Sequence, residues 1–172
     1  MTPLPGPARQ IGFVVEDFDA TLQSWLAIGV GPWHVMRGIS FAGLYRNQPC
    51  EVTLSIGLTN IGDMQIEVIQ QENDGPSIYT EFLDSGRRGF HQLAWWTADF
   101  DATLRGAQAA GWPVVWSGGQ DLGARFAYLE PSAGPAEILE IVELSEGVSA
   151  FNDLIRDAAD GWDGSDPIRT LG

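Results

Sequence analysis

Short apolar runs and helical patterns alternate along the chain in a fixed order. The run QIGFVV at 10–15 is rich in β-branched and aromatic residues, which is typical of a strand. Asp17 can cap a following helix, and Gly29 can end it. The apolar side of that helix consists of Leu22, Trp25 and Leu26. Further strand-like runs lie at about 33–38, 52–58 and 64–70. The pattern predicts a β-α-β-β-β module over about residues 8–73.

The same order returns in the second half of the chain. The segment DFDATL occurs at 17–22 and again at 99–104, an offset of 99 − 17 = 82 residues. We interpret it as a strand-to-helix connection in which an Asp caps the helix. Strand-like runs follow at about 114–116, 125–129 and 138–144. A second β-α-β-β-β module is therefore predicted over about residues 89–146.

Helical patterns also join and follow the two modules. A linker helix is predicted at 76–85, where Pro occupies the first turn. A C-terminal helix and an irregular tail are predicted over 147–172. The expected fold is α+β: two tandem modules that form one cupped mixed sheet, with a C-terminal helix, in a single domain of 172 residues.

The charge balance narrows the classes of partner. The chain has 23 acidic and nine basic residues, all nine of them Arg, for a net charge of −14. Nucleic acid and anionic membrane surfaces are therefore not expected as partners. The lone Cys50 forms no internal disulfide, and the first ten residues lack the pattern of a signal peptide. The expected location is the cytoplasm.

Four polar residues interrupt apolar strands at corresponding places in the two modules. They are Gln10 and Glu67 in the first module, and Gln92 and Glu140 in the second. A buried polar side chain without a partner costs about 1–3 kcal/mol, so such residues need a partner or a function. If the modules pair about a pseudo-twofold axis, the four side chains converge. They would then form either an all-oxygen metal site or an acid–base pair.

The chain resembles the vicinal oxygen chelate superfamily, which includes glyoxalase I, methylmalonyl-CoA epimerase, extradiol dioxygenases and bleomycin-resistance proteins. The resemblance spans roughly residues 8–145. Its motifs are QIGFVVEDFDATLQSWLAIGVGPW, MQIEVIQ, GFHQLAWWTADFDATL and ILEIVEL. The segments around GPW at 31–33 and GFHQLAWW at 89–96 are most similar to the epimerase and glyoxalase-like branch.

The resemblance implies metal ligands at Gln10, Glu67, Gln92 and Glu140. The third of these four ligand positions departs from the family pattern. Gln92 stands where the family usually has a His, and His91 precedes it. Adjacent strand residues point to opposite faces, so His91 should face away from Gln92 unless a bulge turns it inward. Such an all-oxygen set suits Mg²⁺, Mn²⁺ or Ca²⁺. Without a metal, the two glutamates would form an acid–base pair, with His91 as a further catalytic candidate.

Aromatic and basic residues supply candidates for substrate binding. Trp96 is predicted on the inward face of its strand. With Trp33, Tyr45, Tyr128 and Arg125, it would line a cup for a ring-bearing or apolar substrate. The leading hypothesis is an isomerase, epimerase or lyase in which one glutamate removes a proton next to a carbonyl and the other returns it. The alternative is a metal-free protein that binds or sequesters a small molecule. The resemblance also implies a homodimer.

Overall fold

The computed structural model describes residues 4–171, and its element order repeats the β-α-β-β-β pattern. The first module contains β1 (Gln10–Val14), α1 (Phe18–Ala27), β2 (Trp33–Tyr45), β3 (Gln48–Ile61) and β4 (Met64–Gln71). The second contains β5 (Gly89–Thr97), α3 (Phe100–Ala109), β6 (Val114–Gly118), a 3₁₀ turn (Gln120–Leu122), β7 (Phe126–Leu129) and β8 (Ile138–Glu143). Helix α2 (Ile78–Asp84) lies between the modules, and α4 (Glu146–Ala159) and β9 (Ile168–Thr170) follow them.

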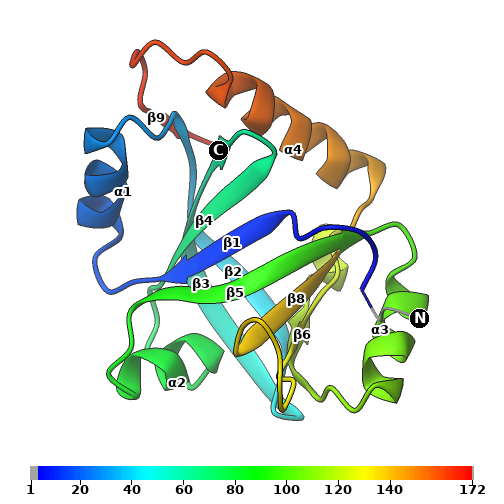
Figure 1. Cartoon of the computed structure of the whole chain (residues 1–172). Coiled ribbons are helices and arrows are strands. Elements are labelled where there is room, and N and C mark those ends of the chain that lie inside the picture. Colours follow the sequence, from blue (N-terminus) through cyan, green and yellow to red (C-terminus); the bar gives the residue numbers. More distant parts are fainter. Residues whose placement is uncertain (1–3, 172) are drawn as a thin grey trace.

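The repeated DFDATL segments build the same corner twice. Asp17 accepts a hydrogen bond from the backbone N–H of Ala20 at 2.9 Å, and Asp99 accepts one from Ala102 at 3.0 Å. Each Asp therefore caps the helix that begins one residue later, as the sequence predicts. The two corners turn α1 and α3 back onto the outside of the sheet (Figure 1).

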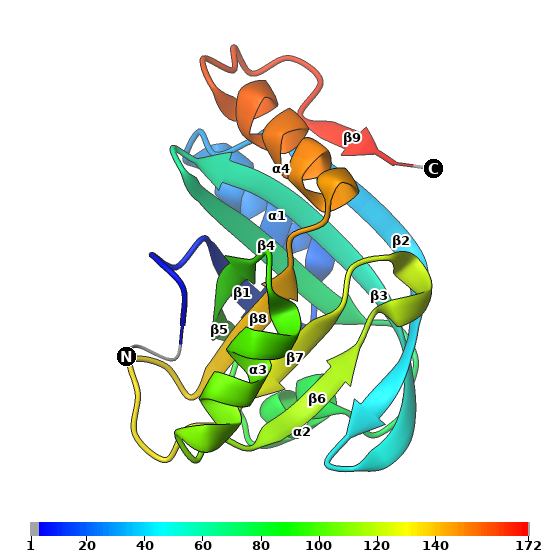
Figure 2. The same ribbon diagram turned by 90° about the vertical axis from the view of Figure 1, so that its right-hand side faces the viewer.

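The sheet curls into a barrel-like cup and closes. Its strand order is β3-β4-β1-β5-β8-β7-β6-β2-β9, and β2 also pairs with β3. The modules meet where β1 pairs antiparallel with β5 and where the tip of β2 pairs with β6. The closure depends on β2 and β3 being much longer than the sequence pattern indicated (Figure 2). The tail also differs from the irregular segment expected, because β9 adds parallel to β2.

The two faces of the sheet bury different apolar clusters. The outer face packs against α1 and α3. The inner face surrounds side chains of α2 and α4, which lie at opposite ends of the barrel (Figures 1 and 2). Helix α2 contributes Ile78, Tyr79 and Phe82, and α4 contributes Ile155. Polar residues on the inner face therefore lie in a largely apolar interior. No helix among residues 4–171 is long and apolar enough to span a membrane.

Closure through β2 and β6 requires a glycine at position 43. Gly43 pairs with Gly118, and a Cβ on Gly43 would lie 2.0 Å from the carbonyl oxygen of Ser117. That oxygen belongs to the backbone, so the strands must separate to admit a methyl group. We expect Gly43→Ala to lower the free energy of unfolding by about 1–3 kcal/mol in urea titrations. The control Gly147→Ala places its methyl group on α4 no closer than 4.0 Å to its nearest neighbour, Ser145 Oγ, and should cause no loss. Equal unfolding curves for Gly43→Ala and the wild type would contradict this account of closure.

Candidate functional site

Two carboxyl groups face the interior of the barrel from different modules. Glu67 lies on β4 and Glu140 on β8, and these strands are separated by β1 and β5. We call Glu67 and Glu140 the carboxyl pair. Gln92 of β5 lies beside them, and its Nε2 donates to Glu67 Oε2 at 3.2 Å and to the Tyr128 hydroxyl at 3.1 Å. The geometry thus joins two glutamates and an amide that are far apart in the sequence.

A glycine on the neighbouring strand leaves room for this amide. Gly12 of β1 pairs with Glu67 on one side and with Gln92 on the other. A Cβ at position 12 would lie 2.1 Å from Gln92 Nε2. The absence of a side chain at Gly12 therefore lets Gln92 lie across β1 and reach Glu67.

A bulge in β5 places His91 on the same side as Gln92. Gly12 pairs with Gln92 while the next residue, Phe13, pairs with Phe90, so His91 is skipped in the ladder. His91 and Gln92 are both buried, at 3% and 0% exposure. His91 Nδ1 contacts Gln92 Oε1, and its ring packs edge-on against Phe82 at 4.9 Å. The simple alternation of strand faces, which would point His91 away, does not hold here.

His91 is neutral in this setting. Burial is the largest effect and lowers the pKa of His91 to about 4, although the contact with Gln92 opposes it. A neutral imidazole that faces the Gln92 carbonyl oxygen carries its proton on Nδ1. Its Nε2 has no hydrogen-bond partner among residues 4–171 and is an acceptor. The amide of Gln92 is thereby held with its N–H groups towards Glu67 and Tyr128.

Burial and mutual repulsion keep protons on the carboxyl pair. Burial raises the pKa of Glu67 to about 7, while the hydrogen bond from Gln92 lowers it. Burial, and secondarily the charge on Glu67, raise the pKa of Glu140 well above its usual range. Near neutral pH, Glu140 therefore holds a proton and Glu67 exchanges one. This combination provides a carboxylic acid beside a carboxylate.

A second polar cluster lies one step further along β1 and β4. Gln10 Nε2 donates to Gln65 Oε1 at 2.8 Å, and Gln65 Nε2 donates to Asn152 Oδ1 at 3.1 Å. We call these three residues the amide chain. Gln10, predicted to join the carboxyl pair, is thus hydrogen-bonded to Gln65 instead. The sequence places Gln65 on the same face as Glu67 and leaves open which of the two points deepest into the cup. Nothing in the apolar pattern of the C-terminal helix indicated that Asn152 would take part in such a cluster.

The hydrogen bonds of the four residues expected as metal ligands fall into two clusters. Glu67, Gln92 and Glu140 lie together, whereas the Gln92 oxygen contacts His91 and Gln10 is in the amide chain. Among residues 4–171, no group of three or more His, Cys, Asp and Glu side chains is placed to hold a metal ion. Only two of the expected ligands, Glu67 and Glu140, are residues of these types, so the metal assignment stays a prediction.

The predicted substrate-binding residues lie in several places. Tyr128 is beside the carboxyl pair. Trp33 is buried on the outer face among residues of α1, and Tyr45 contacts Glu81 in the middle of α2. Arg125 binds Glu143 at 2.7 Å and Asp101 at 3.0 Å. Trp96 lines a pocket next to α4. The structure therefore brings only Tyr128 of these five residues directly to the pair.

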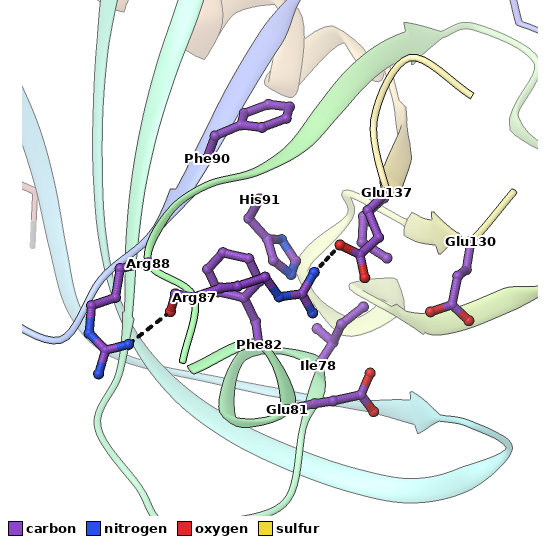
Figure 3. A pocket seen from close by; sticks show the side chains of 10 residues that line it. Ile78, Glu81, Phe82, Arg87, Arg88, Phe90, His91, Glu130 and Glu137 are labelled. Carbon is purple, nitrogen blue, oxygen red and sulfur yellow. Dashed lines mark hydrogen bonds and ion pairs between the residues drawn. The ribbon is translucent and has the colours of Figure 1, made fainter. Parts of the chain in front are cut away.

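A pocket of about 360 Å³ lies between α2 and the start of β8. His91, Phe82 and Phe90 line it (Figure 3). Arg87 extends across it, forms an ion pair with Glu137 and lies over the Phe82 ring. His91 is therefore the one residue of the polar interior just described that also borders this pocket.

The raised pKa of Glu67 predicts how stability depends on pH. Between its ordinary value of 4.5 and about 7, the unfolded chain releases a proton that the folded protein retains. The free energy of unfolding should therefore fall as pH rises through this interval. In urea titrations at several pH values, the free energy of unfolding of Glu67→Gln should fall by about 1–3 kcal/mol less than that of the wild type over this interval. Glu51→Gln, at an exposed position, should behave as the wild type. Parallel curves for wild type and Glu67→Gln would contradict the prediction.

Comparison with known proteins identifies the family of this chain. The family model described as glyoxalase/bleomycin resistance protein/dioxygenase superfamily matches residues 9–128. No match was found among curated proteins.

Solved structures of methylmalonyl-CoA epimerases share the fold. A variant from Streptomyces coelicolor in complex with 2-nitronate-propionyl-CoA has 20% sequence identity and a TM-score of 0.60, covering 81% of this chain and 95% of that chain. An epimerase in complex with methylmalonyl-CoA and NH4⁺ has 21% identity and a TM-score of 0.59, covering 81% and 94%. The Mycobacterium tuberculosis epimerase has 19% identity and a TM-score of 0.57, covering 83% and 91%.

Proposed function

Because the chain belongs to the glyoxalase/bleomycin resistance protein/dioxygenase superfamily, we propose that it is an enzyme that moves a proton at a carbon next to a carbonyl group. The reaction would be an epimerisation or isomerisation. The observation that carries the proposal is the carboxyl pair, in which the half-buried Glu67 and the buried Glu140 come from different modules and lie beside one amide. Two carboxyl groups with raised pKa values can supply both a base and an acid near neutral pH.

The two glutamates take different roles in this proposal. Glu67, which ionises near pH 7, accepts the proton when the C–H bond breaks, and the electron pair moves into an enolate. Glu140, which holds its proton, gives it to the same carbon when the enolate collapses. When the proton returns from the opposite side, the configuration of that carbon is inverted. The enzyme recovers its starting state when the proton that Glu67 accepted passes to Glu140. Gln92 orients Glu67 through its hydrogen bond, and no step requires a metal.

The substrate class is proposed from the structural neighbours and the residues together. The epimerases that share the fold are described with methylmalonyl-CoA or 2-nitronate-propionyl-CoA. An acyl thioester with an acidic C–H bond is thus the first compound to test. We also propose a homodimer in the cytoplasm. The exposed Leu154 on α4, 52% accessible, is an apolar residue that a second copy could cover.

Deuterium incorporation tests the proton transfer directly. Methylmalonyl-CoA would be incubated with the protein in D2O, and exchange at the carbon between the carbonyl groups followed by mass spectrometry. We expect Glu67→Gln and Glu140→Gln each to reduce exchange by about 100-fold or more, because each removes one proton carrier. Exchange by the wild type should rise with pH around 7 as Glu67 ionises. Glu51→Gln is the matched control and should retain full exchange.

The outcomes separate the candidate functions. Full exchange in both glutamate variants would exclude the acid–base pair. Tight binding of the thioester without exchange in the wild type would identify a binding protein of the same fold.

A further inference from the structure

A pocket beside α4 has an excess of arginine in a strongly acidic protein. Its volume is about 460 Å³, and it lies between α4, the segment before β1 and the end of β5. Its polar and aromatic lining consists of Arg9, Trp96, Ser149, Asn152, Asp153 and Arg156. We call it the α4 pocket. Two of the nine arginines of the chain line it with one acidic residue, although the whole chain has a net charge of −14. Because Asp157 as well as Asp153 pairs with Arg156, the positive charge that can attract an anion to this pocket is that of Arg9.

The two arginines differ in how they are engaged. Arg156 pairs with Asp153 at 2.8 Å and with Asp157 at 2.9 Å, so its charge is largely balanced within α4. Arg9 is exposed and takes part in no ion pair within residues 4–171. A carboxylate or phosphate can therefore bind the Arg9 guanidinium without displacing a protein partner.

Asn152 adds an amide donor to the same pocket. Its side chain is only 9% exposed, and its Oδ1 accepts from Gln65. The Asn152 Nδ2 group is not among the fully buried side-chain atoms that lack a hydrogen-bond partner between residues 4 and 171. As part of a residue that lines the α4 pocket, it can donate to a ligand oxygen there. An acceptor is therefore the ligand group that this residue favours.

The α4 pocket is adjacent to the carboxyl pair through the amide chain. Asn152 contacts Gln65, and Glu67 is two residues further along β4 on the same face. Two strand residues span about 7 Å. Gln65, which is 2% exposed, connects Asn152 to this part of β4, so a small molecule with an anionic group in the α4 pocket would reach Glu67 by a spacer that passes the Gln65 side chain. The half-buried Trp96 offers an apolar surface for such a spacer.

We propose that the α4 pocket binds the anionic group, a carboxylate or a phosphate, of the substrate that reacts at the carboxyl pair. Arg9 supplies the charge and Asn152 a hydrogen-bond donor. The substrate is then an anionic carbonyl compound rather than a neutral one. This inference rests on the proposed function for what the ligand does, but its binding can be measured separately.

Calorimetric titrations at low salt test the binding. The probes are malonate, inorganic phosphate and coenzyme A, each added alone to the full chain. We expect at least one probe to bind, and Arg9→Gln to weaken it about tenfold because a charged donor is lost. Arg105→Gln removes the same charge from an exposed position on α3 and should weaken binding less than twofold. Binding of malonate alone would assign a carboxylate, and binding of phosphate or coenzyme A would assign a phosphate group.

A second variant tests the Asn152 side-chain donor. Asn152→Asp retains an oxygen for Gln65 but replaces the amide nitrogen with an acceptor, so it should abolish binding of the same probe. Thermal unfolding would confirm that α4 is intact, and Arg9→Gln provides a test that leaves α4 unchanged. The proposal is overturned if no probe binds, if Arg9→Gln binds as the wild type does, or if Arg105→Gln weakens binding equally.

The two proposals fail in distinguishable ways. Glu67→Gln should bind the probe with wild-type affinity while it loses exchange. Undiminished deuterium exchange in that variant would refute the proposed function, and the result on anion binding would still stand. Conversely, unchanged binding in Arg9→Gln would refute the α4 pocket even if Glu67→Gln is inactive.

Discussion

The antiparallel pairing of β1 with β5 is the contact on which the site depends. It joins the two modules and puts β4, β1, β5 and β8 side by side. Gly12 then lies between Glu67 and Gln92, and Glu140 follows on the next strand. Residues that are distant in sequence meet because equivalent strands of each module face one interior. The duplication of a simple motif is thus enough to bring two carboxyl groups together.

Closure of the barrel determines the chemistry of those groups. The inner face is filled by apolar side chains from α2 and α4, so water can solvate the carboxyl pair only poorly. A charge in such surroundings is costly, and the protein reduces that cost by retaining a proton. Gln92 favours ionisation of Glu67 because it donates to that carboxylate. The pKa of Glu140 is raised further than that of Glu67 because the charge on Glu67 adds to the effect of burial.

Local patterns in the sequence predicted the regular parts of this arrangement. The Asp caps, the two modules and the inward direction of Glu67, Gln92 and Glu140 all follow from short-range rules. The sequence offered the bulge at His91 only as an alternative to regular alternation, because the bulge depends on how β5 pairs with β1. The outward position of Trp33 reflects the packing of α1, which composition does not reveal. Asn152 reaches the amide chain only because α4 lies over one end of the barrel.

The barrel and α4 contribute different kinds of charged residue, which suggests why this acidic chain has arginines at the end of the barrel that α4 covers. Equivalent strands of the two modules provide the carboxyl groups, which can transfer a proton but would repel an anionic substrate. Helix α4 lies outside the duplicated pattern, and with Arg9 it adds donors to one end of the barrel. Attraction at that end would offset repulsion by Glu67 only if the two act on different parts of one molecule. The separation between the α4 pocket and the carboxyl pair therefore favours a substrate with its charge a few bonds away from its reacting carbon.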